Sequence, residues 1–504
     1  MSLATVLTRA QQGVNAPLVS VEIHLGNGLP SVSVVGLPEA AVRESKDRVR
    51  AAIVNAHFEF PARRITINLA PADLPKEGGR FDLPIALGIL AASGQIPSEA
   101  LPRYEFLGEL SLAGELRPVR GVLPAAIAAR AADRALVVAR GNAAEAALIE
   151  GLTVLPADHV LEVCQHLVQG DTLLPHRRAT QTMRPAYNVD LADVRGQAHA
   201  RRALEIAAAG RHHLLMIGPP GTGKTMLASR LATILPSMTE AEALASATVN
   251  SISHHGFQVE RWRLRPVRTP HHTASGVALV GGGSVPMPGE ISLAHEGVLF
   301  LDELTEFDRR VLEVLREPLE TGTITISRAS RQAEFPARFQ LVAAMNPCPQ
   351  GYDCDLRHNC RCTPEQQRKH RARISAPLLD RIDIQIEVPK LPQEALRAGQ
   401  PTETSAVVRD RIESSRARQL RRLGKPNADM NNREVETYCQ LTPSDQALLD
   451  QVMARFRLSA RAYHRILKVA RTIADLADAE QIATAHLSEA LSYRAMDRWL
   501  AAQI

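Results

Sequence analysis

The spacing of hydrophobic positions changes along this chain and divides it into blocks. In the first block, short apolar runs typical of strands alternate with longer runs that have the period of helices. The expected strands are residues 19–24, 31–35 and 64–69, and the expected helices are residues 39–56, 83–92 and 122–132. This alternation predicts an α/β domain over residues 1–169.

Two further blocks follow. Residues 170–189 lack periodicity and contain Pro175 and Pro185, which predicts a linker. Residues 190–390 again alternate between strand and helix patterns, which predicts a second α/β domain. After Pro389 and Pro392 the pattern becomes helical, with amphipathic stretches at 405–422, 443–457, 460–477 and 484–500. We therefore expect an α/β core followed by a helical lid over residues 391–504.

Composition sets only broad limits. A chain of 504 residues should form about three domains. Its 59 Lys and Arg against 54 Asp and Glu permit a polyanionic partner without requiring one. No N-terminal stretch has the layout of a signal peptide, and the longest apolar run, residues 83–94, is too short to span a bilayer. We expect a cytoplasmic protein with no membrane partner.

The second α/β block contains a phosphate-binding loop. It follows the apolar run 214–217 and precedes a helical stretch at 226–235, which is the strand–loop–helix context such a loop requires. Its glycines let backbone N–H groups surround phosphate oxygens, its lysine reaches the outer phosphates, and its last hydroxyl can bind Mg²⁺. The loop consists of Gly218, Pro219, Pro220, Gly221, Thr222, Gly223, Lys224 and Thr225.

An acidic pair follows about eighty residues later. The apolar run 298–301 ends in Asp302 and Glu303. Asp302 is placed to hold Mg²⁺ together with Thr225, and Glu303 to polarise the attacking water. The loop and the acidic pair together predict a nucleoside triphosphatase that uses ATP and Mg²⁺.

Two more polar residues extend this prediction. Asn346 follows the apolar run 341–344 and one methionine, at the carboxyl end of an expected strand, where it could orient the hydrolytic water. Arg381 follows an expected helical turn and could stabilise charge on the γ-phosphate of a neighbouring subunit. Alternatively, Arg381 only pairs with Asp380 or Asp383 on the surface, and the residues alone leave both interpretations open.

Three further segments carry a family resemblance. They are Arg-Pro-Val-Arg-Thr-Pro-His-His-Thr at 265–273, Gly-Gly-Gly at 281–283 and Pro-Gly-Glu-Ile-Ser-Leu-Ala-His at 288–295. With the P-loop, they resemble the magnesium-chelatase-like AAA+ ATPases over nearly the whole chain. The resemblance implies an ATPase that forms a ring, a hexamer, and acts on DNA by driving branch migration of recombination intermediates in natural transformation. It also implies that Arg381 acts on the neighbouring subunit and that Arg461 is the lid arginine that senses nucleotide.

The N-terminal block is similar to the proteolytic domain of the Lon family, with two departures. Arg80 stands where that family has its nucleophilic serine, in the Pro-Lys-Glu-Gly-Gly-Arg run 75–80. Leu123 stands where it has its catalytic lysine, after Arg-Gly-Val at 120–122. A Ser/Lys dyad needs a hydroxyl and a titratable amine, so we expect no peptidase activity.

A β-hairpin is expected between residues 320 and 338, with Arg328 and Arg331 at its turn. In the related ATPases this hairpin and a glycine-rich insert, here residues 281–288, point into the central pore. Arg328 and Arg331 would then contact DNA phosphates without reading sequence. The alternative is an ordinary solvated turn.

A cluster of four cysteines suggests a second metal. The four cysteines could supply four thiolates, which suit a tetrahedral Zn²⁺ ion. Their spacing is not that of paired C-x-x-C motifs. The alternative interpretation is a thiol-rich surface loop. Histidine pairs at 212–213, 254–255 and 271–272 have no acidic or cysteine partner at ligand spacing, so we expect structural roles for them. The clustered cysteines are Cys348, Cys354, Cys360 and Cys362.

Two other function classes compete with a DNA motor. A chelatase-type subunit that remodels a protein partner shares the ATPase core, but such subunits lack the Lon-like block. An ATP-dependent protease is disfavoured by Arg80 and Leu123. Stimulation of ATP hydrolysis by polynucleotide would separate the first class from the other two.

Overall fold

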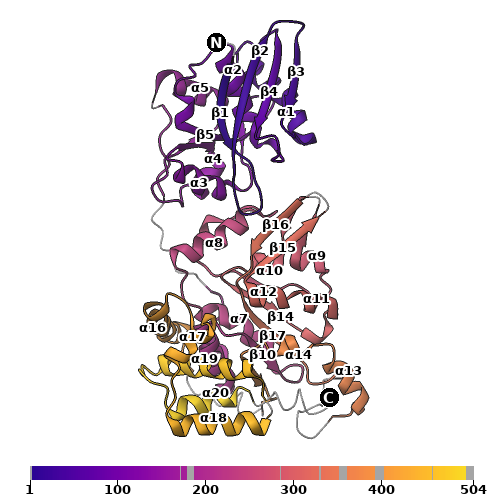
Figure 1. Ribbon diagram of the computed structural model, residues 1–504, viewed down its shortest axis with the longest axis vertical. Helices are drawn as coiled ribbons and strands as arrows, with labels where there is room; N and C mark the ends of the chain where they lie inside the picture. The colour runs from indigo at the N-terminus through magenta and orange to yellow at the C-terminus, as the bar shows by residue number, and fades with distance from the viewer. Residues whose placement is uncertain are drawn as a thin grey trace. The chain divides into compact units, whose positions relative to one another are not determined.

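The computed structural model of the protein describes residues 3–170, 172–178, 187–283, 285–328, 331–350, 360–391, 402–456 and 458–494. The chain divides into two compact units (Figure 1). Unit 1 consists of Met1–Met183, Ala247–Trp262 and Ser327–Phe335. Unit 2 consists of Arg184–Ser246, Arg263–Ile326 and Pro336–Ile504.

The described N-terminal part of unit 1 contains two main sheets, one two-stranded ribbon and the helices that pack around them. Its strands are β1 (Leu3–Arg9), β2 (Leu18–Gly26), β3 (Ser31–Val35), β4 (Arg64–Ala70), β5 (Tyr104–Leu107), β6 (Glu109–Leu110), β7 (Leu116–Arg117), β8 (Ala135–Ala139) and β9 (Val154–Ala157). Its helices are α1 (Ala40–Asn55), α2 (Asp82–Ala92), α3 (Val122–Ala131), α4 (Arg140–Ala146) and α5 (Val160–Gln169).

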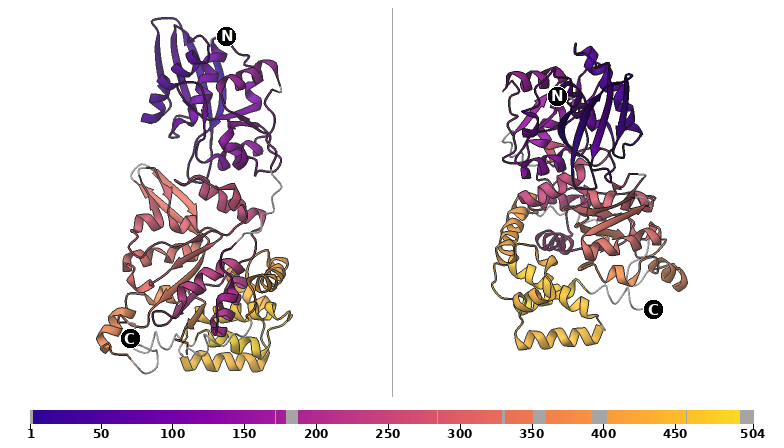
Figure 2. Two further views of the ribbon diagram at one scale, coloured as in Figure 1. Left: turned by 180° about the vertical axis from the view of Figure 1, so that it is seen from behind. Right: turned by 45° about the horizontal axis from the view of Figure 1, so that its top comes forward.

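The larger sheet of unit 1 has the order β1-β2-β4-β3, in which only the β3–β4 pair is parallel. The smaller sheet has the order β5-β8-β9 and is parallel throughout. Helix α2 packs on β1 and β2, and every one of its residues is buried because its sequence is apolar on nearly all sides. Figure 2 shows the larger sheet, in indigo, beside the magenta helices of the same unit.

The rest of the chain carries the parallel sheet of unit 2. The strands in this part of the chain, of which β16 lies mostly in unit 1, are β10 (Leu214–Ile217), β11 (Val267–Arg268), β12 (Gly281–Gly282), β13 (Met287–Pro288), β14 (Val298–Leu301), β15 (Thr323–Arg328), β16 (Arg331–Pro336), β17 (Gln340–Met345) and β18 (Ile384–Glu387). Its helices up to the sheet's last strand are α6 (Ala198–Gly210), α7 (Lys224–Ile234), α8 (Glu240–Ser251), α9 (Gly276–Val280), α10 (Glu290–Leu293), α11 (Arg309–Val314), α12 (Arg316–Thr321), α13 (Pro364–Arg371) and α14 (Ala376–Leu379).

The sheet has the order β11-β14-β17-β10-β18, and each described pair is parallel. Strand β10 therefore lies between β17 and β18, and the carboxyl ends of β10, β14 and β17 meet at one edge. Two small antiparallel ribbons, β12–β13 and β15–β16, lie outside this sheet. This arrangement places the P-loop, the acidic pair and Asn346 next to one another.

In the part of the chain after β18 that the structure describes, there are five helices. They are α16 (Ser405–Leu423), α17 (Asn432–Tyr438), α18 (Pro443–Phe456), α19 (Ala460–Leu476) and α20 (Thr484–Ser492). The amphipathic helix α19 packs against α6, α16 and α20. Its buried residues belong to the same hydrophobic core as those of β10 and β18. The helical C-terminal block is therefore anchored directly on the parallel sheet.

Most elements expected from periodicity are present. Helix α1 matches the expected 39–56, α2 matches 83–92, and α3 matches 122–132, each within about two residues. The last helix is shorter than expected: α20 ends at Ser492, and residues 495–504 lie outside the described part. Within the described residues, no helix is both long and apolar enough to cross a membrane.

Candidate nucleotide-binding site

The P-loop connects β10 to α7 through a backbone that only glycine adopts easily. Gly221 has a φ of +78° and Gly223 a φ of +89°, in the left-handed region that disfavours side chains. A Cβ on Gly218 would lie 2.2 Å from the carbonyl oxygen of Val388, the residue after β18. The loop's glycines are therefore required both by its turn and by its close approach to the neighbouring strand.

Lys224 is the first residue of α7 and is largely buried. Its Nζ donates to the carbonyl oxygens of Gly218 at 2.7 Å and Pro219 at 2.9 Å, and to Oδ1 of Asn346 at 3.1 Å. Burial lowers the pKa of Lys224, while the nearby carboxylates of Asp302 and Glu303 act in the opposite direction. The lysine is thus held in the loop and joined to the end of β17.

Thr225 and Asp302 form the second part of the site. The Thr225 hydroxyl donates to Oδ2 of Asp302 at 2.6 Å, and Oδ1 of Asp302 accepts from the backbone N–H of Glu303 at 2.9 Å. Hydroxyl and carboxylate oxygens are suitable ligands for Mg²⁺, so this pair fits the metal that a nucleotide would bring. Glu303 has a φ of 52°, a left-handed conformation that is uncommon for residues other than glycine and recurs at functional sites.

These side chains surround one cavity of about 340 Å³. The P-loop, the end of β14 and the end of β17 all contribute to it. Its lining consists of Pro220, Gly221, Gly223, Lys224, Thr225, Asp302, Glu303 and Asn346.

One histidine that we expected to be structural lies in this site. Nδ1 of His272 is 3.4 Å from Oε2 of Glu303, an acidic partner that is distant in sequence but close in space. His212 is fully buried, and its Nε2 pairs with Oγ1 of Thr472. His213 is partly buried, and its Nδ1 accepts from the backbone N–H of Leu341. Of His212, His213 and His272, only His272 therefore lies next to the acidic pair.

The two arginines expected to act on nucleotide converge on Glu320, near the end of α12. Arg381 directs its Nη2 to Oε1 of Glu320 and its Nη1 to the carbonyl oxygen of Pro377 at 2.5 Å. Nη2 of Arg461, on α19, lies 3.6 Å from the same Glu320 oxygen. Neither arginine lines the cavity around the P-loop.

The surface pairing considered for Arg381 is different from the one observed. Asp383 pairs with Arg465 at 2.5 Å, and Asp380 accepts from the Ser459 hydroxyl at 3.3 Å. Arg381 itself is 4% exposed, so it is not an ordinary surface arginine.

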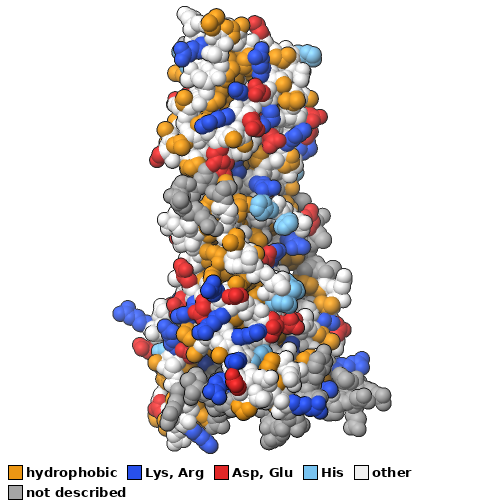
Figure 3. Space-filling view, turned by 90° about the vertical axis from the view of Figure 1, so that its right-hand side faces the viewer, with side chains coloured by type: hydrophobic (Ala, Val, Ile, Leu, Met, Phe, Trp, Pro, Cys, Tyr) orange, Lys and Arg blue, Asp and Glu red, His pale blue; other side chains and the backbone are white. Residues whose placement is uncertain are grey.

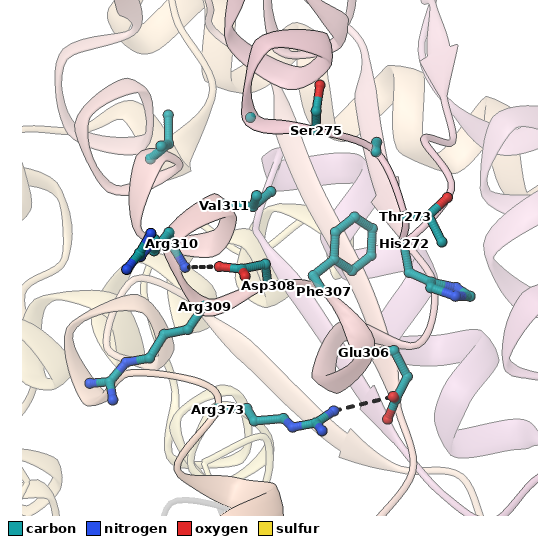
Figure 4. A pocket seen from close by; sticks show the side chains of 13 residues that line it. His272, Thr273, Ser275, Glu306, Phe307, Asp308, Arg309, Arg310, Val311 and Arg373 are labelled. Atoms are coloured by element: carbon teal, nitrogen blue, oxygen red, sulfur yellow. Dashed lines mark hydrogen bonds and ion pairs between the residues drawn. The ribbon is translucent and has the colours of Figure 1, made fainter.

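A larger cavity of about 890 Å³ adjoins the site (Figure 4). Arg309, Arg310 and Arg373 line it, together with His272. Arg373 pairs with Glu306 at 3.1 Å, and the Asp308 carboxylate accepts from the backbone N–H of Arg310 at the start of α11. His272 links the two cavities because it lines the larger one and contacts Glu303 in the smaller one.

Comparison with known proteins decides the family. Residues 190–396 match the family described as magnesium chelatase, subunit ChlI, and residues 402–494 match its C-terminal part. Residues 21–142 match a third model, subunit ChlI of Mg-chelatase. Competence protein ComM of Haemophilus influenzae is 54% identical over 508 residues, which cover 99% of both chains. The chain belongs to the magnesium-chelatase-like ComM/YifB family.

Other members of the ComM/YifB family are nearly as similar. YifB of Salmonella typhimurium is 52% identical and YifB of Escherichia coli is 51% identical, each over 501 residues that cover 99% of this chain and 98% of the relative. The similarity therefore extends across both units. It agrees with the mixed α/β architecture and its parallel nucleotide-binding sheet.

In this ComM/YifB family member, the two positions compared with the Lon dyad are buried. Arg80 donates from Nη2 to the Gln11 side chain and to the carbonyl oxygen of Arg120, each at 2.7 Å, and burial lowers its pKa to about 10. Leu123 is fully buried on α3. Neither side chain supplies a nucleophile or a general base.

The remaining expected site residues are only partly described. Arg328 is the last residue of β15 and Arg331 the first of β16, and their side chains lie outside the described part. Cys354 also lies outside the described residues. The sulfur atoms of Cys348, Cys360 and Cys362 all lie within 4.8 Å of one another.

Proposed function

We propose that the protein is an ATPase that uses ATP and Mg²⁺ at the cavity around the P-loop. The observation that carries this proposal is the convergence of Lys224, Thr225, Asp302 and Glu303 on that one cavity. Backbone N–H groups of the loop and Lys224 would bind the phosphates, and Thr225 and Asp302 would hold Mg²⁺, which neutralises phosphate charge when bound. Glu303 would take the proton of the attacking water, and Asn346 would orient that water.

We further propose that ATP hydrolysis drives a DNA motor that promotes branch migration of recombination intermediates in natural transformation. Support comes from the end-to-end similarity to a relative named competence protein. The working form is a cytoplasmic homo-oligomeric ring, a hexamer. Arg381 would serve the nucleotide of the neighbouring subunit, which fits its position outside the cavity of its own subunit, and Arg461 would be the lid arginine that senses nucleotide.

The proposed domains are those expected from the sequence. Residues 1–169 form a Lon-like domain without its dyad, and residues 170–189 form a linker. Residues 190–390 form the AAA+ core, and residues 391–504 form the lid. The burial of Arg80 and Leu123 supports a non-proteolytic role for the first domain.

DNA contact is assigned to the β15–β16 ribbon. On the face drawn in Figure 3, Lys and Arg side chains are interspersed with Asp and Glu. Replacing Arg328 and Arg331 by alanine should weaken DNA affinity and reduce the slope of log affinity against log salt by about two. The matched control replaces the exposed Arg43 and Lys46 of α1. DNA binding with an unchanged salt slope in the ribbon variant would contradict the assignment.

The test of the motor combines ATP hydrolysis with strand displacement on a labelled branched DNA. Hydrolysis should rise with DNA, and branches should be resolved by the wild type but not by Glu303→Gln. The variant also measures contaminating ATPase activity.

A protein-remodelling ATPase is the second candidate, favoured by the match of residues 190–396 to a magnesium-chelatase subunit. ATP turnover that is indifferent to every DNA tested would favour this candidate over the motor.

A further inference from the structure

Three cysteines that are separated in sequence come together beside the nucleotide site. Cys348 lies three residues after β17, and Cys360 and Cys362 lie just before α13. Cys348 and Cys362 are buried, and Cys360 is partly buried against them. Their sulfur atoms lie within 4.8 Å of one another.

The cysteines lie between two regular elements, strand β17 and helix α13, that hold them in place. Strand β17 is paired on both sides, by β14 and β10. Helix α13 begins with Pro364 and a reciprocal capping box between Thr363 and Gln366, which stabilises a helix N-terminus. The side chain of Gln367 also donates to the carbonyl oxygen of Cys362 at 3.3 Å. The cysteines are therefore positioned by the fold.

The separation of the thiols suits a shared metal ion. Ligands of a tetrahedral zinc ion with Zn–S distances of about 2.3 Å are about 3.8 Å apart, which the observed limit accommodates. A disulfide would join two sulfurs and leave the third unused in a buried position. Soft thiolate ligands select zinc over Mg²⁺, the ion suited to the oxygen ligands Thr225 and Asp302.

We propose that Cys348, Cys360 and Cys362 bind a structural Zn²⁺ ion through their thiolate sulfurs. Three thiolates and Zn²⁺ carry a net negative charge, and the guanidinium of Arg371 interacts electrostatically with Cys348 and Cys360. One position of a four-coordinate zinc ion is left for a further donor.

The metal site would also position Asn346. This residue lies two positions before Cys348, and its carbonyl oxygen lies 3.0 Å from Nε2 of His370 on α13. Its side-chain oxygen accepts from Lys224. Zinc that holds β17 and α13 together therefore fixes the backbone from which Asn346 reaches the P-loop.

The test measures zinc in the full-length protein purified from zinc-supplied cells under reducing conditions. Wild type should carry about one zinc ion per chain, and Cys348→Ser, Cys360→Ser and Cys362→Ser should each carry almost none. Cys164→Ser and Cys439→Ser, which change buried cysteines elsewhere, are the matched controls and should retain zinc.

A second set of measurements uses the wild-type protein, so that the test does not depend on whether the cysteine variants fold. Removing metal from the wild type with a chelator should lower its melting temperature and expose three additional thiols, and adding zinc should reverse both changes. Cobalt added to the chelated protein should give a thiolate-to-cobalt charge-transfer band. Wild type with well under one zinc ion per chain and no stabilisation by added zinc would overturn the proposal. A mass two hydrogens lighter under non-reducing conditions, reversed by a thiol, would instead indicate a disulfide and also overturn it. All these outcomes are independent of ATP hydrolysis and DNA.

Discussion

Glu303 is constrained from two directions. Its backbone adopts a left-handed conformation while its N–H donates to Asp302, and its carboxylate lies 3.4 Å from His272. His272 is therefore a positioning residue for the group that we assign as general base.

Replacing His272 by alanine should reduce kcat for ATP hydrolysis by about 10- to 100-fold, the range found for residues that orient a functional group, with little change in KM. His272→Asn should recover part of the rate, because an amide N–H can still donate to Glu303. His271→Ala is the matched control, since Nδ1 of His271 pairs with Thr273 instead. Steady-state kinetics would count against this role if both alanine variants lost the same activity.

His213, which is partly buried, and His295, which is buried, should make the stability of the protein depend on pH. Burial lowers the pKa of His213 to about 4 and, with help from Arg211 and Arg338, that of His295 to about 3. Each accepts a backbone hydrogen bond on Nδ1, from Leu341 and Arg338 respectively, and is therefore neutral when folded.

Between about pH 6.5 and the lowered pKa values of the folded state, these two histidines bind more protons in the unfolded chain than in the folded protein. Their contribution to stability is complete above about pH 6.5 and is lost as the pH falls towards 4, by at most about 1.4 kcal/mol per pH unit for each histidine. A variant with His213→Asn and His295→Asn keeps an acceptor at each site and should show a shallower decline. Urea unfolding of both proteins at several pH values checks this, and equal slopes would contradict it.

At the scale of elements, the β12–β13 ribbon depends on a backbone contact that excludes a side chain. A Cβ on Gly289 would lie 2.3 Å from the backbone nitrogen of Gly281 and 2.4 Å from the carbonyl oxygen of Leu279. Gly289→Ala should therefore force the ribbon away from α9.

If the ribbon belongs to the DNA-contacting pore, Gly289→Ala should reduce the DNA-stimulated part of ATP hydrolysis several-fold. Gly276→Ala is the control, because a Cβ there meets nothing within 4 Å. Hydrolysis with and without DNA measures the effect, and thermal unfolding reports whether the fold survives. Equal DNA stimulation in both folded variants would exclude the ribbon from that role.

Long periodic elements could be predicted from the sequence, whereas short buried strands could be predicted only where polar site residues follow them, as in β10, β14 and β17. Helices α1 and α19 have clear amphipathic patterns over many residues. Strands β8 and β9 have only five and four residues, mostly buried, so they show no alternation of polar and apolar positions. The acidic pair and the P-loop could be predicted because each is local in sequence.

Contacts between distant residues explain what was missed at the site. His272 and Glu303 are joined by the fold alone, and so are Glu320 and Arg381. Sequence proximity suggested Asp380 or Asp383 as partners of Arg381, but neighbouring positions at the end of a helix direct their side chains differently. The association of β17 and β14 with β10 is needed to see which polar groups share a cavity.

At the scale of the whole molecule, the proposed ring can be tested by mixing inactive subunits. Glu303→Gln lacks the general base but keeps Arg381, whereas Arg381→Ala has an intact cavity but lacks the arginine. If Arg381 serves the neighbouring subunit, mixing the two variants pairs intact cavities with intact arginines and should restore ATP hydrolysis.

Each variant alone is the control and should remain well below wild type, since an arginine of this kind contributes about 10³ to 10⁵ in rate. Hydrolysis is measured across mixing ratios after subunits have been allowed to exchange. Recovery that peaks near equal amounts supports action between subunits. If exchange is verified by labelled subunits and no activity returns, Arg381 acts within its own subunit.

The strand order of the unit 2 sheet also determines when, during synthesis of the chain, the cavity around the P-loop can form. Strand β10 carries the P-loop, yet both strands that flank it, β17 and β18, are made more than a hundred residues later. A nascent chain that has reached residue 235 therefore holds a complete phosphate-binding sequence with no sheet to shape it. The two sheets at the start of unit 1 use strands that lie before residue 158, and they can form first. We therefore expect nucleotide binding to begin only after the ribosome has released the segment that ends in β18.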